Sequence, residues 1–193
     1  LFSKPDSAFY FAQLEYDLAL KVDNKKYLAQ ALNTKGVSFA VRGNNEKALE
    51  NYEKSLKIAE EIDDKRGMGY SYMYIGNIYS NQGNYKKALE YLLKGLKICE
   101  EISDKHGIGD TYIAIGAIYY KQGNYEKALE HYEKDLKIRE EIGDKSGMGN
   151  SYGNIGINYS KQGNNEKAIE YFEKHLKISK EIGDKSGMGG SYN

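Results

Sequence analysis

The sequence has little of what marks several common classes of protein. Its 193 residues include one cysteine, one proline and no tryptophan. One cysteine cannot form an intramolecular disulfide, so nothing in the sequence calls for an oxidising compartment. A single proline, Pro5, in a chain of 29% charged residues favours continuous helices over a sheet-rich fold with proline-marked turns.

The sequence also lacks an excess of charge of one sign and any long apolar run. Lys and Arg number 28, as do Asp and Glu, which gives no electrostatic footprint for nucleic acid or an anionic membrane. No run approaches the roughly 18 apolar residues of a membrane span, and the first residues lack a signal-peptide layout. We therefore expect no nucleic-acid partner, no direct membrane binding and a cytoplasmic location. A segment of a membrane-tethered parent protein would fit the same observations.

What the sequence does have is a period of forty residues. Residues 109–148 and 149–188 are identical at most positions. The recurring positions include Gly36, Gly76, Gly116 and Gly156; Ala48, Ala88, Ala128 and Ala168; Phe39, Tyr79, Tyr119 and Tyr159; and Leu56, Leu96, Leu136 and Leu176. A fixed period of this length is typical of stacked repeats. The chain is therefore predicted to build an extended array of similar units.

Each unit contains two helical patterns. In the first, Tyr72, Ile75 and Tyr79 share one face with Gly76, which we expect to lie where the two helices of the unit cross. Three kinds of residue are predicted to end or cap the helices: glycines after the first helix, asparagines before the second and aspartates before the next unit. These are Gly83, Gly123 and Gly163; Asn84, Asn124 and Asn164; and Asp64, Asp104, Asp144 and Asp184.

This pattern resembles the tetratricopeptide repeat. The matching positions are Leu32, Lys35–Gly36, Phe39, Ala48 and Tyr52; Tyr72, Ile75–Gly76, Tyr79, Ala88 and Leu92; Tyr112, Ile115–Gly116, Tyr119, Ala128 and Tyr132; and Tyr152, Ile155–Gly156, Tyr159, Ala168 and Phe172. Lys35 departs from the apolar residue of the family, and the unit is longer than the usual repeat of about 34 residues and has no closing proline. The resemblance is to the long-repeat branch, and it implies an all-α superhelix, or solenoid, of about nine helices.

The period divides the chain into four whole repeats and two partial ones. We predict repeats at 29–68, 69–108, 109–148 and 149–188. Residues 1–28 would be the second helix of a truncated preceding repeat, and 189–193 the start of a truncated next one. The missing initiator Met fits a piece excised from a longer array. Because neither end shows the polar capping element of a natural array, we expect end-to-end self-association.

No constellation of residues indicates catalysis or metal binding. The three histidines, His106, His131 and His175, each stand alone at their repeat positions and are interpreted as surface substitutions. Cys99 stands where other units have Ala59 and Ser179, which indicates a small residue at a helix surface or at a junction. No zinc-ligand spacing occurs, and no strand precedes the glycines of a nucleotide-binding motif. We expect a protein that is not an enzyme and that carries no cofactor or metal.

In tetratricopeptide arrays the first helix of each repeat lines the concave face. The residues implied at such inward positions are Gln30, Asn33, Thr34, Val37, Ala40 and Val41; Tyr70, Met73, Tyr74, Asn77, Ser80 and Asn81; Asp110, Ile113, Ala114, Ala117, Tyr120 and Lys121; and Asn150, Gly153, Asn154, Ile157, Ser160 and Lys161. From these we predict a peptide-binding groove formed by Asn33, Tyr70, Met73, Tyr74, Asn77, Asn81, Ile113, Tyr120, Lys121, Asn150 and Asn154. Tyrosines are good anchors and asparagines can pair with a peptide backbone.

These observations favour a non-enzymatic protein-interaction scaffold that binds a peptide or helix of a protein partner in this groove. The alternative is a sensory or regulatory repeat segment of a larger signalling protein, such as a histidine kinase, a nucleotide cyclase or a transcription regulator. A designed consensus array is a third hypothesis, which Lys35, Cys99 and the unmatched histidines disfavour.

Overall fold

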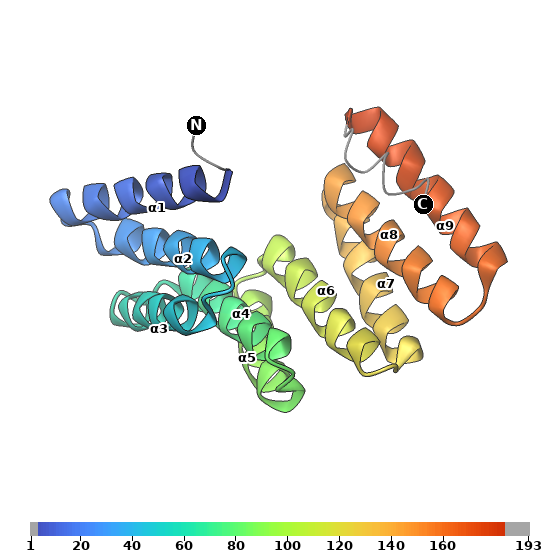
Figure 1. Ribbon diagram of the computed structural model, residues 1–193, viewed down its shortest axis with the longest axis horizontal. Helices are drawn as coiled ribbons and strands as arrows, with labels where there is room; N and C mark the ends of the chain where they lie inside the picture. The colour runs from blue at the N-terminus through green and yellow to red at the C-terminus, as the bar shows by residue number, and fades with distance from the viewer. Residues whose placement is uncertain (1–3, 184–193) are drawn as a thin grey trace. The chain divides into compact units, whose positions relative to one another are not determined.

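The structure, a computed structural model, describes residues 4–183, with side chains from Phe9 onward. Within that range it contains nine helices and no strand (Figure 1). The helices are α1 Lys4–Lys21, α2 Lys25–Val41, α3 Asn45–Glu61, α4 Lys65–Asn81, α5 Tyr85–Glu101, α6 Lys105–Lys121, α7 Tyr125–Ile142, α8 Lys145–Lys161 and α9 Asn165–Ile182. The predicted all-α repeat architecture is confirmed.

The chain forms two compact units, which we call the N-terminal unit, Leu1–Asp104, and the C-terminal unit, Lys105–Asn193. Helices α1–α5 belong to the first and α6–α9 to the second. In each unit, successive helices pack as antiparallel hairpins joined by short turns. The predicted repeat divisions at 29, 69, 109 and 149 fall four residues inside α2, α4, α6 and α8, and the division of the chain at these residues stays a prediction.

The turns inside the hairpins form as their glycines predict. Gly83, Gly123 and Gly163 have φ angles of 77°, 75° and 77°, which favour glycine because it lacks a Cβ atom. The next residue in each turn caps the second helix, as Asn84 does by accepting a hydrogen bond from the Lys87 backbone N–H at 3.2 Å. The hairpin turns are therefore fixed by two consecutive residues.

The aspartate caps are confirmed where the structure gives them. Asp64 and Asp144 accept hydrogen bonds from the backbone N–H groups of Gly67 and Gly147, at the start of α4 and α8. Asp104 precedes α6 and forms an ion pair with Arg66 at 3.0 Å. The predicted cap at Asp184 and the partial repeat at 189–193 lie outside the described residues.

Each core lies between the two helices of a hairpin and the first helix of the next. In the N-terminal unit, one cluster joins Ala48 and Tyr52 of α3 to Ile75 and Ile78 of α4. In the C-terminal unit, Ala128 and Tyr132 of α7 meet Ile155 of α8. The small and large residues that recur at the same positions of each repeat therefore form a core between neighbouring repeats.

The repeated glycine of the first helix lies where the helices cross, as predicted. A Cβ atom at Gly76 would be 2.8 Å from Cγ of Leu92, and one at Gly116 would be 2.6 Å from Cε1 of Tyr132. Real Cβ atoms do not come so close to another heavy atom. Glycine therefore sets the distance between the two helices of the hairpin.

Aromatic rings pack in recurring triplets between the two helices of a hairpin. Tyr91 lies 6.1 Å from Tyr72 and 5.5 Å from Tyr79, measured between ring centroids, and Tyr171 pairs in the same way with Tyr152 and Tyr159. In the C-terminal unit the central ring of the other triplet is His131, between Tyr112 and Tyr119. The imidazole of His131 is half-buried between these two tyrosine rings, so this histidine takes part in side-chain packing and is not a purely exposed substitution.

Candidate functional site

A hollow lies between α2 and α4 of the N-terminal unit, and we call it the α2–α4 hollow. Its volume is about 470 Å³. Its lining residues are Lys26, Gln30, Asn33, Thr34, Val37, Asp64, Arg66, Gly67, Tyr70 and Tyr74. Three of the predicted groove residues, Asn33, Tyr70 and Tyr74, are brought together here.

The side chains of this hollow are held by their neighbours. The Tyr74 ring stacks on Tyr52 of the core, with ring centroids 5.1 Å apart and planes inclined by 19°. Tyr70 lies beside Tyr74 at 6.4 Å, and the Arg66 guanidinium lies 5.8 Å from the Tyr70 ring centroid. Asn33 donates from Nδ2 to Oγ of Ser71 at 3.2 Å. The hollow therefore presents two tyrosines and one amide in fixed positions.

Other predicted groove residues of this unit lie elsewhere. Met73 is buried, with 7% of its surface exposed, beside the position of Gly95 on α5. Asn77 and Asn81 lie further along α4, half-buried and exposed, and do not line the hollow. The structure therefore places these three outside the set of residues that converge.

A second hollow, in the C-terminal unit, gathers three more predicted residues. This α6–α8 hollow has a volume of about 360 Å³. It is lined by Ile113, Asn150, Gly153, Asn154, Ile157 and His175. Tyr120 lies outside it and packs against Tyr125, with ring centroids 5.6 Å apart, and Lys121 is exposed at the end of α6.

An apolar hollow between α1 and α2 was not predicted. It has a volume of about 500 Å³ and shares Gln30 and Thr34 with the α2–α4 hollow. Leu18, Val22 and Tyr27 line it, with 61%, 55% and 59% of their surface exposed. The signal was present in the apolar residues of 11–22, within the segment predicted to be the second helix of a truncated preceding repeat.

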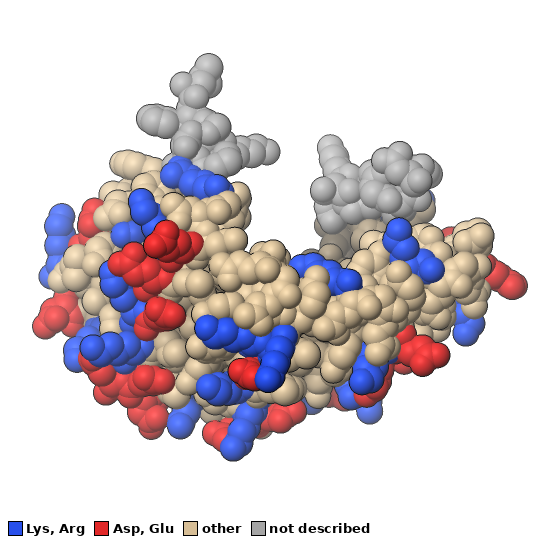
Figure 2. Space-filling view, turned by 60° about the horizontal axis from the view of Figure 1, so that its bottom comes forward, with Lys and Arg blue, Asp and Glu red and all other residues tan. Residues whose placement is uncertain are grey.

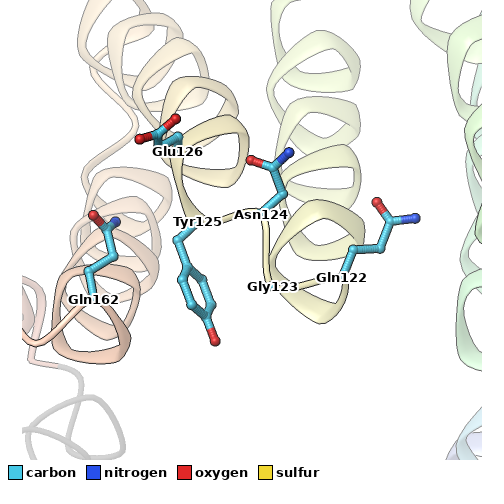
Figure 3. A pocket seen from close by; sticks show the side chains of 6 residues that line it. All are labelled: Gln122, Gly123, Asn124, Tyr125, Glu126 and Gln162. Carbon is cyan, nitrogen blue, oxygen red and sulfur yellow. The ribbon is translucent and has the colours of Figure 1, made fainter.

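A polar hollow of about 500 Å³ lies at the turn between α6 and α7 (Figure 3). Its residues come from that turn, Gln122 to Glu126, and from Gln162 at the end of α8. These positions serve turn and cap formation in each repeat, and Asn124 already caps α7. The residues of this hollow are therefore explained by their part in the turns and caps, and we assign no binding role to it.

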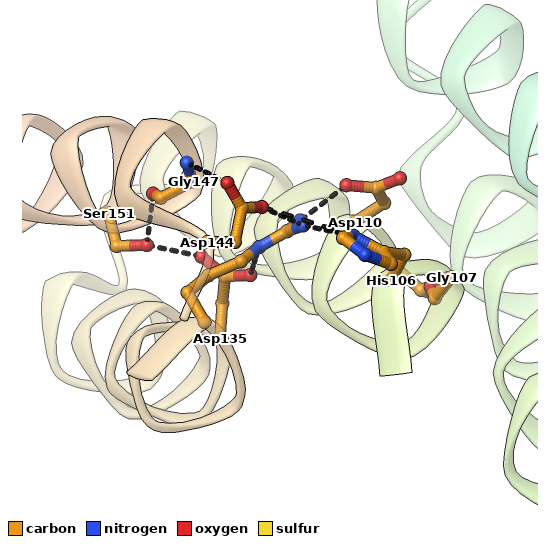
Figure 4. A network of polar contacts seen from close by, with 9 residues as sticks. His106, Gly107, Asp110, Asp135, Asp144, Gly147 and Ser151 are labelled. Carbon is orange, nitrogen blue, oxygen red and sulfur yellow. Dashed lines mark hydrogen bonds and ion pairs between the residues drawn. The ribbon is translucent and has the colours of Figure 1, made fainter. Parts of the chain in front are cut away.

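A network of charges in the C-terminal unit, centred on the buried Arg139 and Asp135, was not predicted from the sequence (Figure 4). Arg139 of α7 contacts Asp110 of α6, Asp135 of α7 at 2.9 Å and the cap residue Asp144 of α8 at 2.9 Å. Its Nη1 also lies 3.4 Å from Nδ1 of His106. The network ties three helices together through one guanidinium.

Burial and charge act against each other in this network. Burial raises the pKa of the Asp135 carboxyl, while contacts with Ser151 and Arg139 act in the opposite direction. Burial also disfavours the Arg139 charge, but the hydrogen bond with Asp110 and the charges of Asp135 and Asp110 hold the pKa of the guanidinium above its ordinary value. One feature of the sequence could have indicated this network: Arg139 stands where other units have the small residues Ala59, Cys99 and Ser179.

The described residues contain no group of three or more His, Cys, Asp or Glu side chains arranged to hold a metal ion. Cys99 is buried and forms no disulfide with any described residue. No helix within the described range has the length and apolar character needed to cross a membrane.

Comparison with known proteins assigns the chain first to a fold class and then to a family. The fold is that of the all-α repeat arrays. Residues 27–101 and 107–181 each match a family model described as tetratricopeptide repeat, so the chain belongs to the tetratricopeptide repeat family. A search of curated proteins finds no match.

Solved structures share the fold at low sequence identity. A Rap protein in complex with competence and sporulation factor has a TM-score of 0.81 at 16% identity over 95% of this chain and 57% of its own. Aspartyl phosphate phosphatase F from Bacillus subtilis has a TM-score of 0.81 at 17% identity over 97% of this chain and 53% of its own. A putative kinesin light chain from Podosopora anserina with nearly identical TPR-like repeats has a TM-score of 0.65 at 15% identity, over 93% and 89% of the two chains. The chain thus spans little more than half the length of the first two.

Proposed function

We propose that the chain is a non-enzymatic scaffold that binds an extended or helical segment of a partner protein on the first helices of its repeats. The observation that carries this proposal is the α2–α4 hollow, where Asn33, Tyr70 and Tyr74 converge. Membership of the tetratricopeptide repeat family supports it.

The chemistry of the α2–α4 hollow suits a peptide. Partly buried tyrosines offer large rigid surfaces, which bury much area in a partner at a small cost in side-chain entropy. The amides of Asn33 and Gln30 can donate to and accept from a peptide backbone. Lys26, Arg66 and Asp64 add charge of both signs, so we expect a segment of mixed character rather than a purely acidic tail.

The proposal is tested by selecting random linear peptides against the whole chain and measuring their affinity for tyrosine variants. We expect Tyr70→Ala to weaken binding by roughly tenfold or more, because a buried aromatic anchor contributes about 2 kcal/mol. Tyr85→Ala is the matched control, since Tyr85 does not line the hollow. Equal affinity of the wild type and the Tyr70 variant would contradict the site.

The alternative function, a sensory or regulatory segment of a larger signalling protein, is favoured by one observation. The chain shares its fold with a Rap protein bound to competence and sporulation factor while spanning 57% of that protein. A kinase, cyclase or DNA-binding domain encoded in the same reading frame would support this alternative. The cytoplasmic location stays a prediction under either function.

A further inference from the structure

One position on the first helix of each repeat differs in size between the repeats. Position 33 is Asn, 73 is Met and 113 is Ile, but position 153 is Gly. Ile113 and Gly153 both line the α6–α8 hollow. The chain therefore has no side chain at one of the positions that line this hollow.

The helices pack less closely at Gly153 than at Gly116 and Gly156. A Cβ atom at Gly153 would lie 3.3 Å from Nδ1 of His175, whereas one at Gly116 or Gly156 would lie 2.6 or 2.7 Å from an aromatic carbon. A glycine inside a helix lowers its stability relative to alanine. A side chain at 153 would thus require only a small shift of the His175 ring, whereas one at 116 or 156 would overlap an aromatic ring.

His175 of α9 lies next to Gly153 and also lines the hollow. Its Nδ1 lies 2.6 Å from the carbonyl oxygen of Gly149, so Nδ1 carries a hydrogen and donates it. Nε2 lies 3.4 Å from the hydroxyl of Ser179, which is buried. Both ring nitrogens are directed at groups of the protein, which fixes the plane of the imidazole.

The residues that line the hollow are apolar side chains, amides and one imidazole. Ile113 of α6 and Ile157 of α8 supply the apolar surface, and 46% of Ile157 is exposed. Asn150 and Asn154 lie one helical turn apart on α8. None of the six lining residues is an acid, a lysine or an arginine, in contrast to the α2–α4 hollow.

We propose that the α6–α8 hollow is a pocket for one aliphatic side chain, Leu, Ile or Met, of the bound segment, with the adjoining peptide backbone held by Asn150 and Asn154. The occupant is deduced from the side chains that the chain itself places at this position in other repeats, Met73 and Ile113. The inference rests on the proposed function, because it names what part of a bound peptide this hollow takes.

The experiment uses the whole chain and peptides selected from a random linear library. We expect the selected peptides to share one aliphatic residue. Its replacement by Ala should weaken binding about tenfold, and Gly153→Ile, which fills the hollow, should weaken binding by a similar factor. The two losses should not add when combined, because both remove the same contact.

Gly153→Ile copies Ile113 and Gly153→Asn copies Asn33, but position 153 faces His175, where those repeats have Asp135 and Ser55. Circular dichroism checks their folding, and Gly153→Ala, which adds only one carbon atom, replaces any variant that unfolds and should give a smaller loss. Unchanged affinity in the Gly153 variants would overturn this pocket.

The outcome for Tyr70→Ala separates this inference from the proposed function. If Tyr70→Ala weakens binding and the Gly153 variants do not, the pocket is wrong and the scaffold function stands. If no peptide is selected, or if Tyr70→Ala binds as the wild type does, the proposed function fails and this inference fails with it.

Discussion

At the residue scale, the distance between paired helices depends on single atoms. The Cβ atom of an alanine at position 116 would lie within 2.6–3.2 Å of three carbons of the Tyr132 ring. We expect Gly116→Ala to lower the free energy of unfolding by about 1–3 kcal/mol through overpacking, although alanine has the better helix propensity. Urea denaturation measures this change.

Making Gly116→Ala in a protein that also carries Tyr132→Ala tests whether the Tyr132 ring causes the loss of unfolding free energy. In Tyr132→Ala the clashing ring is absent, so we expect Gly116→Ala to cost little there or to stabilise the helix. An equal loss in both backgrounds would contradict steric contact with Tyr132 as the reason for glycine at this position.

The buried network around Arg139 makes a second prediction. Arg139→Ala leaves Asp135, which is fully buried, without its cationic partner. We expect this variant to lose about 3–5 kcal/mol of unfolding free energy, because removal of one partner leaves an uncompensated buried charge. Chemical denaturation at neutral pH gives the value.

The first repeat offers the matched control for that network. The equivalent positions there are Ser55 and Ala59, both fully buried. We expect the double variant Asp135→Ser/Arg139→Ala to recover most of the stability that Arg139→Ala loses. A double variant as unstable as the single one would show that the buried charges themselves are not the cause.

His131 makes the stability of the fold depend on pH. Burial lowers the pKa of its imidazole below the ordinary 6.5, and the charge of Lys134 acts in the same direction. The unfolded chain therefore binds the proton first, so the contribution of His131 is fully present above pH 6.5 and decreases as the pH falls below it. We expect thermal stability to decline in that window.

Tyrosine at this position removes the titrating group and keeps the ring. Tyr91 and Tyr171 occupy the equivalent place in two other triplets. His131→Tyr should therefore lose less stability than the wild type when the pH is lowered from neutral to mildly acidic. Parallel pH profiles of the two proteins would contradict a role for His131.

At the element scale, helix type and helix ends could be predicted because each follows from local chemistry. Gly83 and Asn84 determine a turn and a cap within two residues, and the period then repeats the prediction along the chain. Which of the proposed groove residues lie together in a hollow could be predicted only in part, because burial of a side chain depends on its opposite helix. Met73 is buried in the structure, and no pattern within α4 shows that.

Helix α1 carries an apolar face that the other elements do not show. Phe11, Leu14 and Leu18 of α1, and Val22 directly after it, follow a spacing of three and four residues, and each is between 46% and 61% exposed. We expect a second copy of the chain to cover this face at high concentration. Leu14→Glu/Leu18→Glu should abolish the association, whereas a wild type that stays monomeric in light scattering up to millimolar concentration would contradict it.

At the scale of the whole molecule, charge is distributed rather than gathered. Figure 2 shows basic and acidic side chains interspersed on the face in view, in agreement with 28 residues of each sign. The hollows therefore differ in the side chains that line them, and a local excess of charge of one sign does not set them apart. The α2–α4 hollow has charged and aromatic walls, whereas the α6–α8 hollow has apolar walls and amides.

The central claim is that the first helices of the repeats bind a peptide. Backbone amide chemical shifts, recorded during titration with a selected peptide, test it most directly. The account predicts that the largest changes lie around Asn33, Tyr70 and Tyr74 on α2 and α4. Changes confined to the outer helices α3 and α5, with α2 and α4 unaffected, would contradict it.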